Sequence, residues 1–102
     1  MEHIKDLRDS VRAFRALGQE TRFRIVSLLL SKTFSVGELE KHLKVSQSAI
    51  SQQLRVLEKA GLVKLQKEGK YTFCSINRSF LEEINRRINL LLEGRQELGL
   101  TE

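Results

Sequence analysis

The sequence predicts a mostly helical protein with one β-hairpin in its second half, and three observations support this. The 102-residue chain contains no Pro and only six Gly, and residues of high helix propensity are plentiful. Apolar residues recur at the three- and four-residue spacing of a helix over most of the chain. Residues 71–76 instead alternate in the manner of a strand, and they follow a turn at Gly69.

Composition narrows the class of protein further. Lys and Arg number 18 against 13 Asp and Glu, which gives a formal net charge of +5. In so short a chain this balance favours a polyanionic partner. The single Cys excludes an intramolecular disulfide, and neither a signal peptide nor an apolar run of membrane length is present. We therefore expect a soluble, cytoplasmic protein that forms one domain over residues 1–102 and does not bind a membrane.

The first predicted helix covers residues 3–17 and ends before Gly18. Its apolar residues form a seam at 3-4-3 spacing: Ile4, Leu7, Val11 and Phe14. The rest of this helix is charged, so the seam requires another surface to pack on.

The second predicted helix, over residues 19–30, is the most apolar element and is expected to form the centre of the core. Its apolar residues are Phe23, Ile25, Val26, Leu28, Leu29 and Leu30. Arg22 and Arg24 are expected either to anchor phosphates or to be solvated, and solvation is favoured for at least one of them.

Residues 35–60 predict a helix-turn-helix. Ser35 and Glu38 have the spacing of a capping box, which starts a short helix. Ser46 is a suitable N-cap for a second helix, and Gly61 is a suitable end for it. Two short helices joined by a tight turn are typical of this motif.

The two faces of the helix over residues 46–60 differ in character. Ile50, Leu54 and Leu57 recur at i, i+4 and i+7, so they share the face that packs. The opposite face is polar without Asp or Glu, and carries Ser48, Ser51, Gln52, Arg55 and Lys59. Gln can pair with adenine, Arg can pair with guanine, and Ser is short enough for the backbone to approach DNA closely. The alternative is a solvated surface helix without a partner.

Residues 62–76 are predicted to form a β-hairpin whose turn lies at 68–70. Lys64, Lys67 and Lys70 cluster near its tip. A basic hairpin directly after a recognition helix is typical of the wing of a winged helix. The alternative is that these lysines only protect the edge strands from pairing with other chains.

A last helix is predicted over residues 79–93, opened by a capping box of Ser79 and Glu82 and ended by Gly94. Its apolar stripe consists of Phe80, Leu81, Ile84, Ile88, Leu91 and Leu92. The predicted order is therefore four helices, two strands and a fifth helix, which is a winged helix-turn-helix.

Residues 46–63, SQSAISQQLRVLEKAGLV, resemble the motif S-Q-S-x-[IV]-S-x-x-L-x-x-L-x-x-A-G-L-V of the ArsR/SmtB family of winged-helix repressors, and the resemblance covers about residues 16–77. It implies a homodimer in which the first and last helices pack across a two-fold axis, and an inverted-repeat operator in double-stranded DNA. It also implies repression that an inducer releases, and the sequence does not identify the inducer. The residues expected at the dimer interface are Ile4, Leu7, Val11, Phe14, Leu81, Ile84, Ile88 and Leu91.

Seven residues are expected to contact DNA: Gln47, Ser48, Ser51, Gln52, Arg55, Lys67 and Lys70. Gln52 and Arg55 are expected to read base edges. Ser48 and Ser51 are expected to contact phosphates or to permit close approach, and Gln47 is expected to meet a phosphate at the helix N-terminus. Lys67 and Lys70 are expected to contact phosphates or the adjacent minor groove.

The metal sites of this family lack their ligands here. Residues 36–40 contain no Cys-x-Cys pair, and residues 79–93 contain no His, Cys or Asp. Nothing near His3 or His42 has the spacing of a metal site, so we expect neither a metal nor another cofactor. Cys74 is a candidate redox sensor, against the alternative of a small buried hydrophobe in a strand.

Other classes of protein fit less well. The chain has no Gly-rich phosphate loop, no Cys/His pair and no metal cluster, so an enzyme is not expected. A winged helix can instead serve protein–protein assembly without sequence-specific DNA binding, which predicts acidic or apolar residues on the recognition face, whereas residues 47–55 contain no carboxylate. A winged helix that binds RNA is a third alternative, and it predicts a preference for single-stranded or structured RNA.

Overall fold

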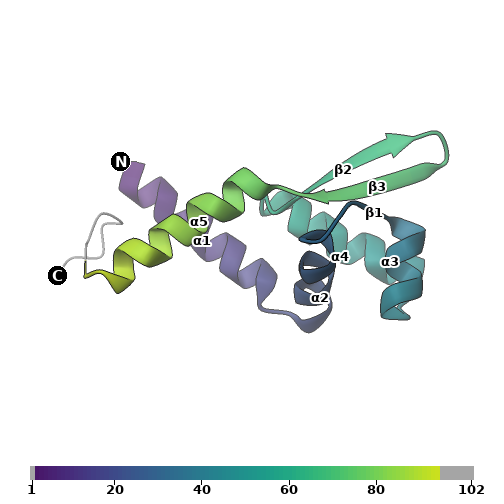
Figure 1. The fold of residues 1–102 in the computed structure, drawn as a ribbon, viewed down its shortest axis with the longest axis horizontal. Helices are drawn as coiled ribbons and strands as arrows, with labels where there is room; N and C mark the ends of the chain where they lie inside the picture. Colours follow the sequence, from purple (N-terminus) through teal and green to yellow (C-terminus); the bar gives the residue numbers. More distant parts are fainter. Residues whose placement is uncertain (1, 95–102) are drawn as a thin grey trace.

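The computed structural model describes residues 2–94, with side chains from Leu7 onward. In this range the elements are α1 (Glu2–Leu17), α2 (Glu20–Leu29), β1 (Phe34–Ser35), α3 (Val36–Leu43), α4 (Gln47–Lys59), β2 (Val63–Glu68), β3 (Tyr71–Ile76) and α5 (Arg78–Leu92) (Figure 1). The predicted fold class, mostly helical with a small β-hairpin, is confirmed.

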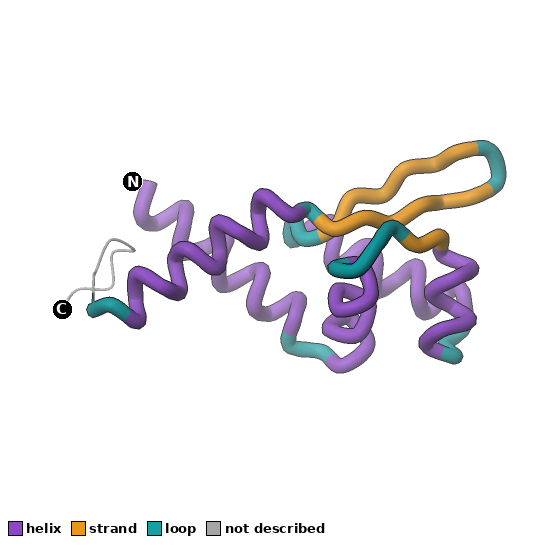
Figure 2. The backbone as a smooth tube through the Cα atoms, viewed as in Figure 1, coloured by secondary structure: helices purple, strands orange, loops and turns teal. Residues whose placement is uncertain are grey.

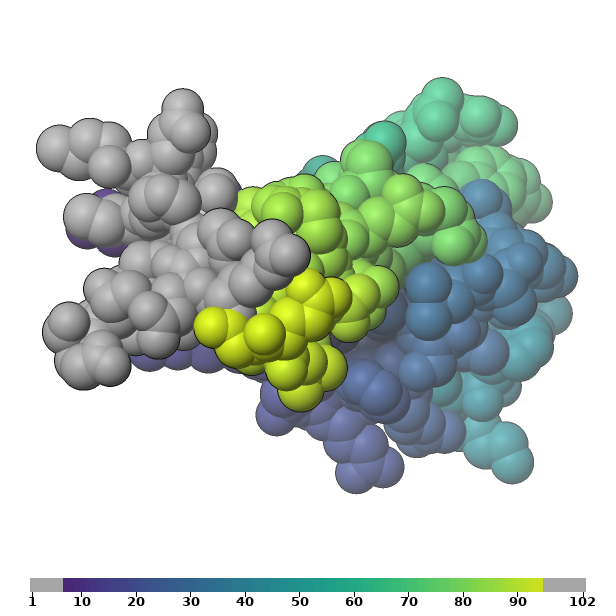
Figure 3. Space-filling model, turned by 60° about the vertical axis from the view of Figure 1, so that its left-hand side comes forward, coloured from purple at the N-terminus to yellow at the C-terminus, as the bar shows by residue number. Residues whose placement is uncertain are grey.

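The molecule has two unlike ends. Helices α2, α3 and α4 pack with the sheet at one end, whereas α1 and α5 cross each other and extend toward the other (Figure 1). The principal extents are 49 × 24 × 21 Å and the radius of gyration is 15.2 Å, against about 13 Å for a compact domain of this length. In the space-filling view that brings this extended end forward, α5 lies across the face in green and yellow (Figure 3).

The core is built around α4. Its apolar face is buried as predicted, and the largest fully buried side chains are Ile25, Leu39, Ile50, Leu54, Leu57, Leu62 and Cys74. Helix α2 was predicted to form the centre of the core, and it contributes Ile25, Val26 and Leu29 to it, but only one of its faces is buried. Phe23 is 57% exposed and Leu30 is 47% exposed, because both lie on the outer side of a helix that buries only one face.

Helices α3 and α4 begin where the sequence predicts. The Ser35 hydroxyl accepts a hydrogen bond from Glu38 N at 3.1 Å, and the Glu38 carboxylate accepts one from Ser35 N at 2.9 Å, so the capping box is complete. The Ser46 hydroxyl accepts from Ala49 N at 3.2 Å. Gly61 follows the end of α4 with φ +84°, a left-handed conformation that glycine adopts readily.

The predicted start of the last helix is wrong. Helix α5 begins at Arg78, and its N-cap is Asn77, whose Oδ1 accepts from Phe80 N at 3.4 Å and from the Ser79 hydroxyl at 3.1 Å. Asn77 also donates from Nδ2 to Gly61 O and from its backbone N to Leu62 O, both at 2.8 Å. These contacts with the end of α4 fix Asn77 as the cap and leave Ser79 inside the first turn.

The sheet has three antiparallel strands in the order β1-β3-β2. The predicted hairpin is confirmed, with Lys67 opposite Thr72 and Glu68 opposite Tyr71, and it projects beyond the helices (Figure 2). The prediction that Lys64 clusters with Lys67 and Lys70 near the tip is wrong, because Lys64 pairs with Ser75 at the base of the hairpin. Strand β1 was not predicted from the sequence, and it pairs Phe34 with Cys74. It holds the base of the hairpin directly against the start of α3.

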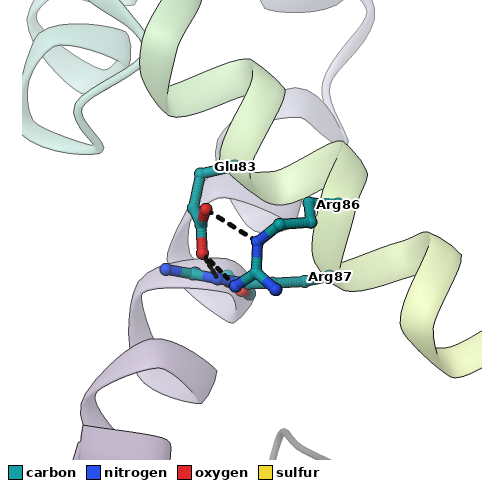
Figure 4. Close-up of polar contacts among 4 residues, drawn as sticks. Glu83, Arg86 and Arg87 are labelled. Atoms are coloured by element: carbon teal, nitrogen blue, oxygen red, sulfur yellow. Dashed lines mark hydrogen bonds and ion pairs between the residues drawn. The ribbon is translucent and has the colours of Figure 1, made fainter. Parts of the chain in front are cut away.

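Helix α5 is fixed to α1 through a buried guanidinium. Arg87 is 5% exposed, and its Nη1 donates to the Ser10 hydroxyl of α1 at 2.7 Å. Its Nε donates to Glu83 Oε2 at 3.1 Å, and Arg86 binds the same carboxylate through Nε and Nη2 at 3.0 and 2.6 Å (Figure 4). These hydrogen bonds hold the pKa of Glu83 at about 2, with the bonds from Arg86 as the largest cause.

The apolar stripes of α1 and α5 are only partly buried within the chain. Val11, Phe14 and Leu91 are exposed, and Leu7, Leu81 and Ile88 are half-buried. Ile84 is 4% exposed and packs in the core of its own chain, so it offers little surface to a second chain. The side chain of Ile4 lies outside the described residues.

Candidate nucleic-acid interface

The candidate interface starts from the exposed face of α4. Ile50, Leu54 and Leu57 anchor the apolar face of α4 in the core, so its polar face must point outward. Gln47, Ser48, Gln52 and Arg55 are exposed and Ser51 is half-buried, as the helical spacing predicts. The first turn holds no acidic residue, so its free N–H groups face no competing carboxylate from the helix itself.

The hairpin lies beside this helix and forms two adjoining grooves with it. Ser51, Arg55 and Lys67 line the first groove together with Val36, Leu54, Leu65 and Thr72. Gln47, Ser51 and Lys70 line the second, together with Ser35, Val36, Gly37, Tyr71 and Thr72. Ser51 belongs to both grooves, so five of the seven residues predicted to contact DNA share one continuous concave surface. Ser48 and Gln52 line neither groove and lie exposed on the same helix.

The sequence did not single out Tyr71 and Thr72, which the structure adds to this surface. Tyr71 is 55% exposed at the tip of the hairpin, and Lys70 Nζ lies 5.6 Å from the centroid of its ring. An aromatic residue directly after Lys70, beside the turn of a predicted wing, was the available signal.

The cations of this surface are available to a polyanion. Among the described residues, Arg55, Lys67 and Lys70 take part in no ion pair. The nearby carboxylate of Glu38 is engaged in the cap of α3, where the hydrogen bond from Ser35 N is the largest cause of its lowered pKa. The surface therefore presents positive charge, hydroxyls and amides together, which suits contact with both phosphates and base edges.

Arg22 is a structural residue, which corrects the expectation that it anchors phosphate or is solvated. Its Nε donates to Ala16 O at 2.6 Å, and its Nη1 donates to Gln53 Oε1 at 2.7 Å. The guanidinium thus joins the end of α1 to α4. Arg24 is exposed, as expected for a solvated side chain.

Cys74 does not have the surroundings of a redox sensor. It is fully buried in the core, and burial raises the pKa of its thiol to about 11. Reactive thiols need exposure and a lowered pKa, so the structure favours the alternative, a small hydrophobe in a strand.

The histidines also have ordinary positions where they are described. His42 Nδ1 lies 2.9 Å from Glu38 O, and its ring meets Phe34 edge-on at 5.2 Å. The side chain of His3 lies outside the described residues. Within the described part of the chain, no three potential metal-binding side chains come together. None of the helices described here has the length and apolar character needed to span a membrane.

Known proteins resemble this chain over most of its length. A family model described as bacterial regulatory protein, arsR family, matches residues 19–65. The transcriptional activator HlyU of Vibrio cholerae is 37% identical over 90 residues, which cover 88% of this chain and 81% of HlyU. The transcriptional repressor SdpR of Bacillus subtilis is 28% identical over 86 residues, which cover 83% and 96%. The structure of an ArsR-like transcriptional regulator from Rhodococcus sp. RHA1 gives a TM-score of 0.80 at 27% identity, covering 88% of this chain and 85% of that one.

A helix-turn-helix of α3 and α4 followed by a basic hairpin defines a winged-helix DNA-binding protein. The similarity to both activators and repressors of this fold makes the protein a transcriptional regulator rather than an enzyme. The chain belongs to the ArsR family.

Proposed function

We propose that this chain is a single winged-helix domain over residues 1–102 that acts as a homodimeric repressor on an inverted-repeat operator. The observation that carries this proposal is the division of the molecule into two ends. The polar face of α4 and the basic hairpin meet at one end, and the exposed apolar side chains of α1 and α5 lie at the other.

The proposed DNA contacts follow from the two grooves. Gln52 and Arg55 read base edges in the major groove, since both are exposed on the outer face of α4. Ser48 and Ser51 let the helix approach closely or bind phosphate, and Gln47 meets a phosphate at the helix N-terminus. Lys67 and Lys70 contact the backbone or the adjacent minor groove from the hairpin.

The proposed dimer joins the extended ends of two chains. Val11, Phe14 and Leu91 are large apolar side chains between 41% and 45% exposed, and Leu92 is exposed further. Packing them against a second copy removes this apolar area from water, at about 25 cal/mol per Å². For both α4 helices of such a dimer to enter the major groove on one face of the DNA, they must be separated by about 34–36 Å or a multiple of it.

Repression is the proposed direction of regulation, as the name of SdpR states for that relative, whereas HlyU is named an activator.

Fluorescence anisotropy tests this function. The full chain is titrated onto duplex DNA from its own upstream region and onto a scrambled duplex, at several salt concentrations. We expect tight preference for the upstream DNA and a steep salt dependence. Equal and weak binding to both duplexes would contradict the proposal and favour protein–protein assembly. Tighter binding to single-stranded or hairpin RNA of the same sequence would favour an RNA-binding role.

A further inference from the structure

A cavity separate from the two grooves lies where α1, α2 and the C-terminal half of α4 meet. Its volume is about 560 Å³, within the range of small-molecule sites, which is about 300–1,000 Å³. It shares no lining residue with the two grooves beside the hairpin. Its occupant would therefore not displace the residues proposed to contact DNA.

The cavity has an apolar floor and a cationic rim. Ala16, Val56 and Ala60 supply the floor, and Ala16 and Ala60 are buried. The charged lining residues are Arg12, Arg15, Arg22 and Lys59. Among the described side chains, no carboxylate lines the cavity and none forms an ion pair with Arg12, Arg15 or Lys59. Four like charges around one hollow repel one another, so an anion placed among them relieves that repulsion.

Within the described chain, Arg22 is the one charged lining residue that hydrogen bonds hold in place, whereas Arg12, Arg15 and Lys59 are exposed. It is half-buried, and two of its nitrogens are committed to Ala16 O and Gln53 Oε1. Nη2 makes no hydrogen bond to any described residue, so a donor of a positioned guanidinium remains for a ligand. A floor of methyl groups beside this donor matches a molecule with an apolar body and a negatively charged group. The phosphates of a nucleic acid would not require such a floor.

We propose that this cavity binds a small amphipathic organic carboxylate, and that its occupancy alters DNA binding. The apolar body lies on Ala16, Val56 and Ala60, and the carboxylate pairs with Arg22 and the exposed cations of the rim. The expected effect on DNA binding rests on the proposed function. Val56 and Lys59 belong to α4, and the Arg22–Gln53 hydrogen bond joins the cavity to the same helix. A ligand bound to Arg22 Nη2 contacts the guanidinium that joins α1 to α4, and therefore changes how α4 is held relative to α1.

Solution NMR of the ¹⁵N-labelled full chain, without DNA, tests the site. The probes are 2-naphthoate and its uncharged counterpart 2-naphthamide. We expect 2-naphthoate to shift the amide resonances of Ala16, Val56 and Ala60 in a saturable manner. The amide should bind at least about tenfold more weakly, because it loses the charge-assisted hydrogen bonds. Equal affinity for the two probes would overturn the role of the cations.

A matched pair of variants distinguishes binding in this cavity from nonspecific attraction of the probe to a positively charged protein. Arg12→Gln combined with Lys59→Gln changes two exposed rim residues, and should weaken 2-naphthoate binding about tenfold. Arg24→Gln removes an exposed cation from α2 outside the cavity, and should leave the affinity unchanged. Equal effects of both variants, or no saturable binding to the wild-type chain, would overturn the site. The second result is also expected if the partner subunit fills the cavity.

Anisotropy with upstream DNA then tests the coupling. Saturating 2-naphthoate should change the affinity of the wild-type chain by at least about fivefold, within the usual range of allosteric coupling. At a 2-naphthoate concentration just sufficient to saturate the wild-type chain, the Arg12→Gln, Lys59→Gln chain should show a clearly smaller change, because its site is only partly occupied. Binding in the NMR titration without an effect on DNA affinity would overturn the coupling. Because that titration contains no DNA, its failure would leave the proposed DNA-binding function intact.

Discussion

Replacing Lys67 and Lys70 by Ala should lower the salt dependence of operator binding by a calculable amount. Both side chains line the grooves between the hairpin and α4, and neither takes part in an ion pair within the described chain. Each phosphate contact contributes a slope of about −0.9 to the logarithm of affinity against the logarithm of salt. The proposed dimer has two hairpins and hence four such lysines, so the slope should become shallower by up to about 3.6.

The assay is fluorescence anisotropy of the operator duplex over a series of salt concentrations, for the wild-type chain and for the double variant. Lys64→Ala is the matched control, because Lys64 lies opposite Ser75 at the base of the same hairpin and lines neither groove. Its slope should equal that of the wild-type chain. An unchanged slope in the double variant would show that the hairpin does not contact DNA. An equal change of slope in the double variant and in the control would show that the hairpin contributes only nonspecific positive charge.

Three further results are expected. Arg55→Ala should cost about 1–3 kcal/mol of operator binding and relax the preference at one base pair, because a base-edge contact is lost. Leu91→Glu should give a folded monomer by light scattering, since it places a charge in the proposed interface at a residue that is exposed within one chain. Glu83→Gln should weaken the dependence of unfolding free energy on acid pH. The pKa of Glu83 is lowered to about 2 in the folded chain, so its stabilising effect is complete above the unfolded pKa of about 4.3 and is lost as the pH falls toward 2.

Each of these results has a control or a contradicting outcome. Arg24→Ala removes an exposed Arg away from both grooves and should not alter operator binding. Phe23→Glu changes an exposed apolar residue of α2 and should leave the dimer intact. An intact dimer in the Leu91→Glu chain would refute the assignment of α5 to the dimer interface. An acid unfolding curve of Glu83→Gln parallel to that of the wild type would refute the role of that carboxylate.

The parts of the fold predicted from sequence are those set by local chemistry. The capping box of Ser35 and Glu38 needs only residues three apart, and the hairpin needs alternation on both sides of a turn at Gly69. Strand β1 escaped prediction because two residues cannot show alternation, and its pairing with β3 joins positions about forty residues apart. The cap of α5 escaped for a similar reason. Asn77 and Ser79 are both good N-caps, and contacts of Asn77 with Gly61 and Leu62 decide between them.

The candidate site likewise has features that the sequence predicts and features that depend on the tertiary structure. Helical spacing was sufficient to predict which face of α4 is exposed, because three buried residues fix the rotation of the helix. The nearness of Lys67 to Arg55 and of Lys70 to Gln47 depends on how the hairpin folds back over α4, and no local pattern encodes it. Arg22 also required the structure, since its partners lie six and thirty-one residues away.

Helix α1 connects the proposed dimer to the proposed carboxylate site. Val11 and Phe14 lie on its exposed apolar side, whereas Arg12 and Ala16 line the cavity shared with α4. The separation of the two α4 helices in a dimer depends on how each α4 is held against its own α1, because α1 would contact the two-fold axis. A ligand between these helices would therefore act on the spacing between half-sites, which must match the pitch of DNA for both helices to bind at once. This position allows a change in affinity even though the ligand touches none of the residues proposed to contact DNA.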